Sequence, residues 1–194
     1  TANNDDLTIA ANVTHTGVAG TAKTLRFRAG DDILHNSGTI SFTNANTADK
    51  VALTADVDGA AGGGETDRGG ITQSGGGITA SGLALRSFEN AALTAGTNDV
   101  DKLAASITEP NGSLSFTDSD DLTVDTVDGV AGITTNTGNV TLNTGAAITI
   151  GDGTNGQDIA AAGGTVTLNP TAGGVSETTG SIITATNLLL TGAG

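Results

Sequence analysis

The sequence predicts an all-β fold, a right-handed parallel β-helix in which short strands stack coil upon coil. Three observations favour this β-solenoid: a 26-residue repeat of apolar pairs, alternation of apolar and small polar residues within each pair, and 30 glycines in 194 residues. The chain has four Phe and no Trp or Tyr. A narrow tube filled by stacked aliphatic side chains leaves little room for aromatic rings, which explains their scarcity.

The repeat is clearest in the C-terminal half. Three stretches begin with matching apolar pairs at the 26-residue interval: Leu114 and Phe116, Val140 and Leu142, Val166 and Leu168. Further apolar positions recur with the same period, at Leu122/Val124 and Ile148/Ile150 and at Ile133 and Ile159. The last pair, Leu188 and Leu190, follows after a shorter, 22-residue interval. We therefore expect side chains one period apart to lie directly over one another inside the tube.

The same 26-residue period appears near the N-terminus. Together with the length of the chain, it gives the expected number of coils. Leu25 and Phe27 precede Val51 and Leu53 by one such interval, and Asp5-Asp6-Leu7 precedes Asp31-Asp32-Ile33 by the same distance along the chain. We expect about seven or eight coils of roughly 22 to 26 residues each. Residues 1–194 are predicted to form a single β-solenoid segment of a longer protein. Both ends read as strands, so we expect a longer molecule or end-to-end stacking.

A few segments depart from the strand pattern. Ala, Leu, Glu and Lys collect in Ser87–Ala95 and Val100–Ser106, and each is given a helical turn as an alternative. Residues 60–77 are rich in Gly and are predicted to form a projecting loop or an irregular coil. Asn143 and Asn169 are interpreted as turn formers in preference to a stacked hydrogen-bonded ladder.

Charge and composition limit the partners. Seven Lys and Arg oppose 21 Asp and Glu, for a net charge of −14, and all seven basic residues lie at or before Lys102. Such a field repels nucleic acids and anionic lipids. The chain has no Cys, hence no disulfide frame, and its longest run of large apolar residues is only Leu188–Leu190. We expect no nucleic-acid partner and no membrane insertion.

The repeats resemble those of filamentous haemagglutinins and related giant bacterial surface exoproteins, a group of adhesins. The resemblance covers about residues 83–194 well and residues 1–80 loosely, and it is carried by Leu93–Leu103, Asp120–Val124, Val140–Leu142, Ala147–Ile150 and Ile182–Leu188. It implies a β-helical shaft that is secreted and associated with the cell surface. Its partners would be further coils of the same or an identical chain, and a host-cell, neighbouring-cell or matrix surface. The expected role is structural and adhesive, with no enzymatic activity.

Few residue patterns point to chemistry, and we expect no catalytic, cofactor or metal site. Asp31 with Asp32, and Asp118 with Asp120 and Asp121, could bind Ca²⁺, although solvated turn carboxylates are the favoured interpretation. His15 and His35 are predicted to be surface or turn residues. Three triplets are acceptors for glycosylation, at Asn12, Asn111 and Asn139.

Two rival functions are compatible with a β-helix. A polysaccharide lyase or hydrolase needs clustered acids, and usually aromatic platforms and a basic residue, yet the chain has no Trp or Tyr and no base after Lys102. An ice-binding solenoid needs an unbroken Thr file. Thr135-Asn-Thr137 and Thr184-Ala-Thr186 are predicted to share a face, but Ala161 and Gly163 interrupt it.

Overall fold

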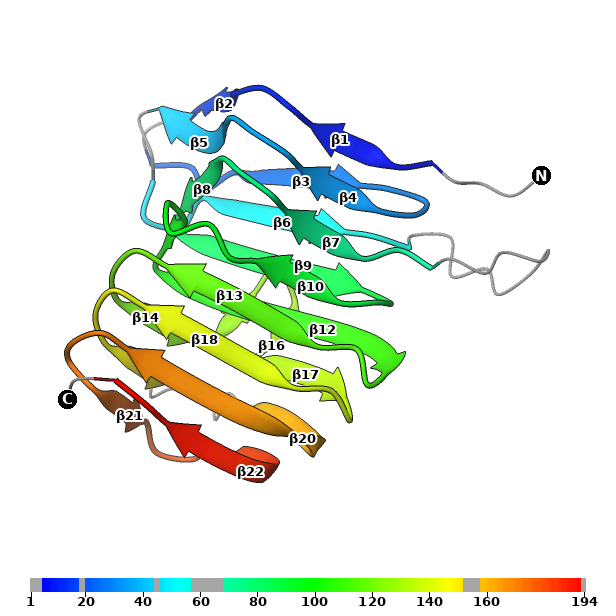
Figure 1. The fold of residues 1–194 in the computed structure, drawn as a ribbon. Helices are drawn as coiled ribbons and strands as arrows, with labels where there is room; N and C mark the ends of the chain where they lie inside the picture. The colour runs from blue at the N-terminus through cyan, green and yellow to red at the C-terminus, as the bar shows by residue number, and fades with distance from the viewer. Residues whose placement is uncertain (1–4, 18–19, 44–45, 57–67, 152–157, 193–194) are drawn as a thin grey trace.

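The computed structural model describes residues 5–17, 20–43, 46–56, 68–151 and 158–192. Within these ranges the regular secondary structure is β-strand, and most strands are parallel members of one 16-stranded sheet that curls until it is nearly closed (Figure 1). This arrangement is consistent with the predicted β-solenoid. Across the described ranges, no helix is long and apolar enough to cross a membrane.

The first wall of the stack contains one strand from each successive repeat. Val140 pairs with Val166 and Leu142 with Leu168, as the 26-residue period predicts, and Val166 pairs in turn with Leu188. From the N-terminal end the strands of this wall are β1 (Leu7–Ile9), β4 (Ile33–His35), β7 (Ile71–Gln73), β10 (Ala91–Leu93), β13 (Leu114–Asp118), β18 (Val140–Thr144), β20 (Ile159–Pro170) and β22 (Ile183–Leu190).

Two further groups of strands complete the tube. One group consists of β3 (Thr24–Arg28), β6 (Lys50–Thr54), β9 (Gly82–Ser87), β12 (Lys102–Pro110) and β17 (Ile133–Asn136), followed by the first halves of β20 and β22. The other contains β2 (Val13–Thr16), β5 (Thr39–Thr43), β8 (Gly77–Ala80) and β11 (Asp99–Val100), and then β14 (Leu122–Val124), β19 (Ile148–Ile150) and β21 (Val175–Glu177).

The core is a set of aliphatic columns that run along the stack. Alternate residues of each strand point inward, so Leu114, Val140 and Val166 form one column and each is 0% exposed. Phe116 fits inside the tube between Leu93 and Leu142 and is also fully buried. Each strand is too short to bury its apolar side alone, so stability comes from contacts between neighbouring coils.

The helical alternative for Ser87–Ala95 and Val100–Ser106 is wrong. Ser87 ends β9, residues 91–93 form β10, and the second segment lies in β11 and β12. Leu103, Ala105 and Ile107 alternate with outward residues and are buried in the columns. Pairing with β9 and β17 on either side therefore outweighs the helix propensity of Ala, Leu and Lys.

The Gly-rich stretch 60–77 falls only partly in the described residues. Residues 60–67 lie outside them. Residues 71–73 form β7, whose Ile71 pairs with Ile33 of β4, so this end of the stretch belongs to the stack. Gly69 is required there because a Cβ at this position would overlap the carbonyl of Asp31.

The two asparagines predicted to be turn formers lie inside strands and form a ladder. The amide of Asn169 donates a hydrogen bond of 3.1 Å to Oδ1 of Asn143, whose own amide reaches Oγ1 of Thr117 at 3.4 Å. Thr191 adds a bond of 3.0 Å to Oδ1 of Asn169. The turn interpretation is therefore wrong, because parallel in-register stacking places equivalent side chains one strand spacing apart, within hydrogen-bonding reach.

One antiparallel hairpin projects from the corner between β14 and β17. It consists of β15 (Thr126–Val127) and β16 (Val130–Ala131), and its turn residues Asp128 and Gly129 have φ of 47° and 78°. Positive φ at both central residues is the geometry that Asp-Gly turns favour. Val127 and Val130 form a second small core with outward-facing Ala52, Ala84 and Ala104.

Candidate functional site

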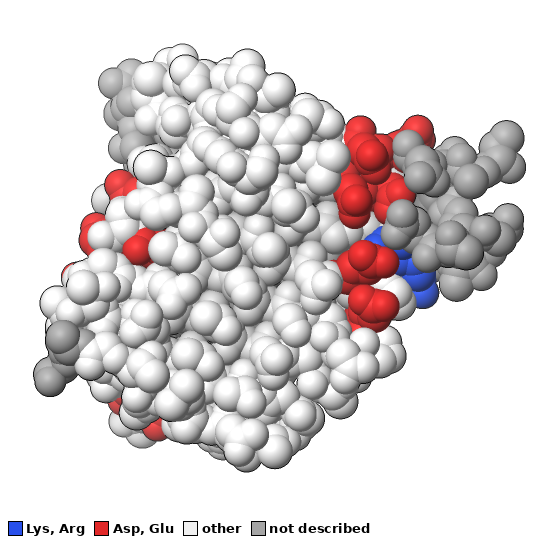
Figure 2. Space-filling model, in the orientation of Figure 1, with Lys and Arg blue, Asp and Glu red and all other residues white. Residues whose placement is uncertain are grey.

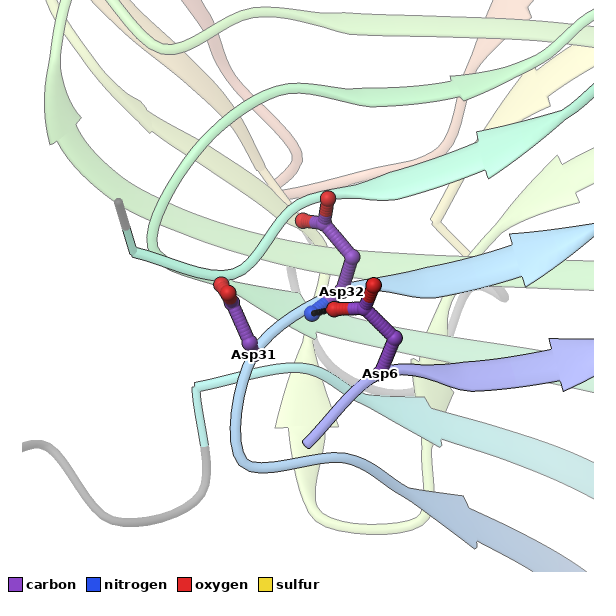
Figure 3. A group of neighbouring side chains, drawn as sticks. All are labelled: Asp6, Asp31 and Asp32. Carbon is purple, nitrogen blue, oxygen red and sulfur yellow. Dashed lines mark hydrogen bonds between the residues drawn. The ribbon is translucent and has the colours of Figure 1, made fainter. Parts of the chain in front are cut away.

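The acidic pair Asp31-Asp32 lies at a corner of the stack, where Asp6 joins it. Their carboxylate oxygens lie within 4.8 Å of one another, which makes this group the best candidate for a cation site among the described residues (Figure 3). However, Oδ1 of Asp6 accepts a bond of 3.3 Å from the amide of Asp32, and Oδ1 of Asp32 accepts one of 2.7 Å from Gly70. With one oxygen from each residue, the three carboxylates supply three of the six to eight oxygens that Ca²⁺ prefers.

The same hydrogen bond from a side chain to the backbone of the next coil recurs at several other corners. An Asp or Asn just before a strand accepts a hydrogen bond from the backbone amide of the corresponding residue one coil further along. The bonds are 2.7 to 3.0 Å long and join Asn12 to Thr39, Asn90 to Ser113, Asp121 to Ala147, Asn139 to Thr165 and Asp158 to Ile182. Many turn acids and amides thus serve to connect successive coils.

The second predicted acidic group is divided by the structure. Asp118 is 2% exposed and accepts bonds from the amides of Val100, at 3.0 Å, and Asp120, at 3.2 Å. Burial raises the pKa of Asp118 to about 7, and Asp120 contributes to the increase. Asp121 is exposed and faces a different partner, the amide of Ala147. Asp99 joins the group instead, and its pKa is raised by desolvation and by the charges of Asp120 and Asp101.

His35 is not the surface or turn residue that the sequence predicts, because it lies in strand β4 and is buried. It replaces an aliphatic side chain in the column between Ile9 and Gln73 and is fully buried. Its Nε2 donates to the carbonyl of Gly38 at 3.1 Å, while Nδ1 lies 3.4 Å from Nε2 of Gln73. Burial lowers the pKa of His35, so the neutral ring is favoured. His15 is half-buried beside the ring of Phe42.

The predicted threonine file is out of register by one residue. Thr184 lies over Ala160, which lies over Thr134, whereas Thr135 belongs to the inward column. Thr135 is buried and its hydroxyl donates to the carbonyl of Gly138 at 2.8 Å. The predicted shared face of Thr135 and Thr184 is therefore wrong. All three glycosylation candidates, Asn12, Asn111 and Asn139, are exposed.

A groove that sequence reasoning missed lies on the outer side of the β3–β6–β9–β12 wall, beside the hairpin. Its volume is about 510 Å³, and its lining includes Arg28, Thr54, Arg86, Ser106 and Thr134. These five residues form one row, because each pairs with the next across neighbouring strands. The sequence could not reveal the row because the spacing between these strands varies.

All four arginines of the chain gather around this groove. Arg26 and Arg86 both reach Asp128 at the hairpin tip, with ion-pair distances of 2.5 and 3.8 Å. Arg68 packs over the ring of Phe88, 3.6 Å from its centre, and pairs with Asp56 at 3.4 Å. Arg28 is exposed and has no hydrogen-bond or ion-pair partner within the described ranges. The groove is thus a local basic region in a chain with net charge −14.

The outer surface of the first wall differs from the basic groove in its charge. Figure 2 shows acidic side chains along the edges of this face and none across its middle. Its central outward row is Thr8, Leu34, Thr72, Ala92, Ser115, Thr141, Thr167 and Leu189, which are paired strand to strand. The middle of this face is therefore uncharged over the whole length of the stack.

Comparisons with known proteins identify no relative. No protein-family model matches the chain, and searches of curated proteins and of solved structures find no match either.

Proposed function

We propose that the chain is the structural shaft of an extracellular fibre or cell-surface adhesin, built as a right-handed β-helix of seven or eight coils. The observation that carries this proposal is the exposed edge of β22. Leu188 and Leu190 continue the column of Val166 and Leu168, yet they are 50% and 58% exposed. A further coil laid on this edge would pair the strand and cover both side chains. Because each is already about half buried, covering the remainder contributes roughly 1 kcal/mol per leucine.

We infer that the covering coil is a further coil of the same chain or the first coil of an identical chain. The column that ends at Leu188 and Leu190 begins at Leu7 and Ile9 of β1. Leu7 is half-buried, with a neighbouring strand on one side. Stacking one copy on the next would continue this column, the parallel register and the uncharged middle of the first wall. A heterologous contact of this kind repeats without closing and produces a filament.

The resemblance of the repeats to haemagglutinin-like surface exoproteins supports the cell-surface location. Within the full-length protein, the shaft would hold an adhesive region away from the cell, towards a host-cell, neighbouring-cell or matrix surface. Antibody labelling of intact producing cells tests this location directly. We expect labelling without permeabilisation, and labelling only after permeabilisation would contradict it.

Sedimentation velocity and electron microscopy of residues 1–194 test the stacking. We expect species that lengthen with protein concentration while keeping a constant width. Leu188→Ser and Leu190→Ser should each shift the equilibrium towards the monomer. Leu189→Ser is the matched control, because Leu189 is 49% exposed on the same strand but pairs with outward-facing Thr167. A monomer at every concentration, or an equal effect of all three substitutions, would contradict end-to-end stacking of identical chains.

A further inference from the structure

The groove beside the hairpin has the features of a ligand site. Its volume of about 510 Å³ lies within the range of small-molecule sites, about 300 to 1,000 Å³. The hairpin residues Gly129, Val130 and Ala131 form one side of it, and Phe88 lines it as well. Its floor is a sheet face whose backbone groups are already paired with neighbouring coils. Recognition must therefore come from side chains.

The charges in the groove select an anion. Arg28 projects into it without a partner in the described parts of the chain, and Arg86 uses its terminal nitrogens only towards Asp128. The two nearest acids are already paired, Asp56 with Arg68 and Asp128 with Arg26 and Arg86. A guanidinium has five donors in a planar fork that matches a carboxylate. Arg28 is thus available to bind a carboxylate group, and Arg86, although it contacts Asp128, adds positive charge beside it.

The spacing of the row selects an extended ligand rich in hydroxyl groups. Arg28 and Arg86 are two strands apart, because Thr54 lies between them, which places their backbones roughly 10 Å apart. Ser106 and Thr134 continue the row beyond Arg86. Serine and threonine hydroxyls both donate and accept, as sugar hydroxyls do. A peptide that binds by strand addition would instead need free backbone groups at a sheet edge, which this face lacks.

We propose that this groove binds an acidic oligosaccharide that lies along the axis of the stack. One carboxylate pairs with Arg28, the positive charge of Arg86 attracts the next carboxylate along the row, and the hydroxyls bond to Thr54, Ser106 and Thr134. The site is on the side wall of the tube, so its occupancy does not depend on end-to-end stacking at β22.

Calorimetric titration of residues 1–194 tests this binding with a tetramer of galacturonate as the probe. We expect saturable binding that weakens between 50 and 500 mM NaCl. A neutral maltotetraose and a tetraglutamate peptide are the comparison ligands, and both should bind at least tenfold more weakly. Equal binding of tetraglutamate would overturn the assignment to a saccharide, and no binding of the galacturonate tetramer would overturn the site.

Substitutions locate the binding site. Arg28→Gln should raise the Kd of the galacturonate tetramer about tenfold, because a charged hydrogen-bonding partner is lost. Ser106→Ala should raise it about threefold. Lys23→Gln removes the same charge at the opposite end of β3, outside the groove, and should leave the Kd within twofold. Circular dichroism checks that each variant is folded. Equal Kd values for Arg28→Gln and Lys23→Gln would show that binding is merely electrostatic and would overturn the proposal.

Discussion

Gln73 and Asn98 exchange two side-chain hydrogen bonds of 2.9 Å inside the stack, each amide donating to the other's oxygen. Asn98 is 0% exposed, and it also accepts from the amide of Ile78 and donates to the carbonyl of Thr117, both at 3.1 Å. One asparagine therefore connects three strand segments around a corner. Such a fully bonded polar group fixes the path of the chain where an aliphatic residue would not.

Asn98→Ala should reduce the free energy of unfolding by about 3 kcal/mol, because it leaves buried donors and acceptors without partners. Asn143→Ala is the control, since Asn143 is only half-buried and its ladder bonds should contribute about 1 kcal/mol. Urea denaturation followed by circular dichroism measures both values. An equal loss for the two variants would contradict the role assigned to Asn98.

Asp118 should make stability depend on pH. Its pKa is raised to about 7 in the fold, from 3.8, so the folded state holds a proton that the unfolded state releases over this range. Stability from this group therefore rises as the pH falls from about 7 to about 4. Compared with Asp118→Asn, the wild type should become progressively more stable over that interval. Thermal melts of both proteins measure the difference, and a difference that is constant with pH would contradict it.

His35 should make stability depend on pH in the direction opposite to Asp118. Burial lowers its pKa below 6.5, so the unfolded state binds a proton more readily than the folded state. Stability from His35 is therefore lost as the pH falls below 6.5. Against His35→Gln, the wild type should lose relative stability on acidification, as thermal melts between pH 7.5 and 4.5 would show. A wild type that gains relative stability over this range would refute the expectation.

Val127→Ala should weaken the hairpin without unfolding the stack. Val127 is 1% exposed and packs on Ala52, Ala84 and Ala104, so losing two methyl groups should cost roughly 2 kcal/mol. Hydrogen exchange should accelerate at residues 126–131 and remain unchanged at β18. Thr126→Ala changes an exposed neighbour and should have little effect. Uniform acceleration through the whole stack would show that the hairpin is not a separate unit.

Asp121 distinguishes a coil-connecting role from cation binding. Asp121→Ala should cost about 1 kcal/mol because the amide of Ala147 loses its acceptor, whereas Asp121→Asn retains an oxygen and should cost little. Thermal melts with and without 5 mM CaCl₂ complete the test. A Ca²⁺-dependent increase in melting temperature that both substitutions abolish would favour a cation site.

The strand register could be predicted where the repeat is regular. The pairs Leu25 with Val51, Leu122 with Ile148 and Val140 with Val166 are all confirmed, since each keeps the 26-residue spacing of aliphatic residues. Ile33, Ile71, Ala91 and Leu114 pair in turn across neighbouring strands. The number of residues between one and the next changes at every step, so no single period aligns them. Register in that region follows from tertiary pairing.

The candidate sites were harder to predict because most of them combine residues that follow no regular repeat. Asp31 and Asp32 could be recognised as a pair because they are adjacent in the sequence, whereas Asp6 joins them only in the fold. His35 was predicted to be a surface or turn residue because a polar residue in an aliphatic column gives no periodic signal. The arginine groove brings together residues from β3 and β9 with a hairpin near residue 128, and no sequence pattern connects segments so far apart.

The contact between Arg26 and Asp128 has a consequence for the order of folding. It joins residues 102 positions apart, whereas many side-chain bonds between coils join residues about 26 apart. On a growing chain, early coils can stack as each new one emerges. The hairpin can close over them only after a further three or four coils have been synthesised. During that interval Ala52 and Ala84 lack their cover, so this outer surface is the last part of the early coils to mature.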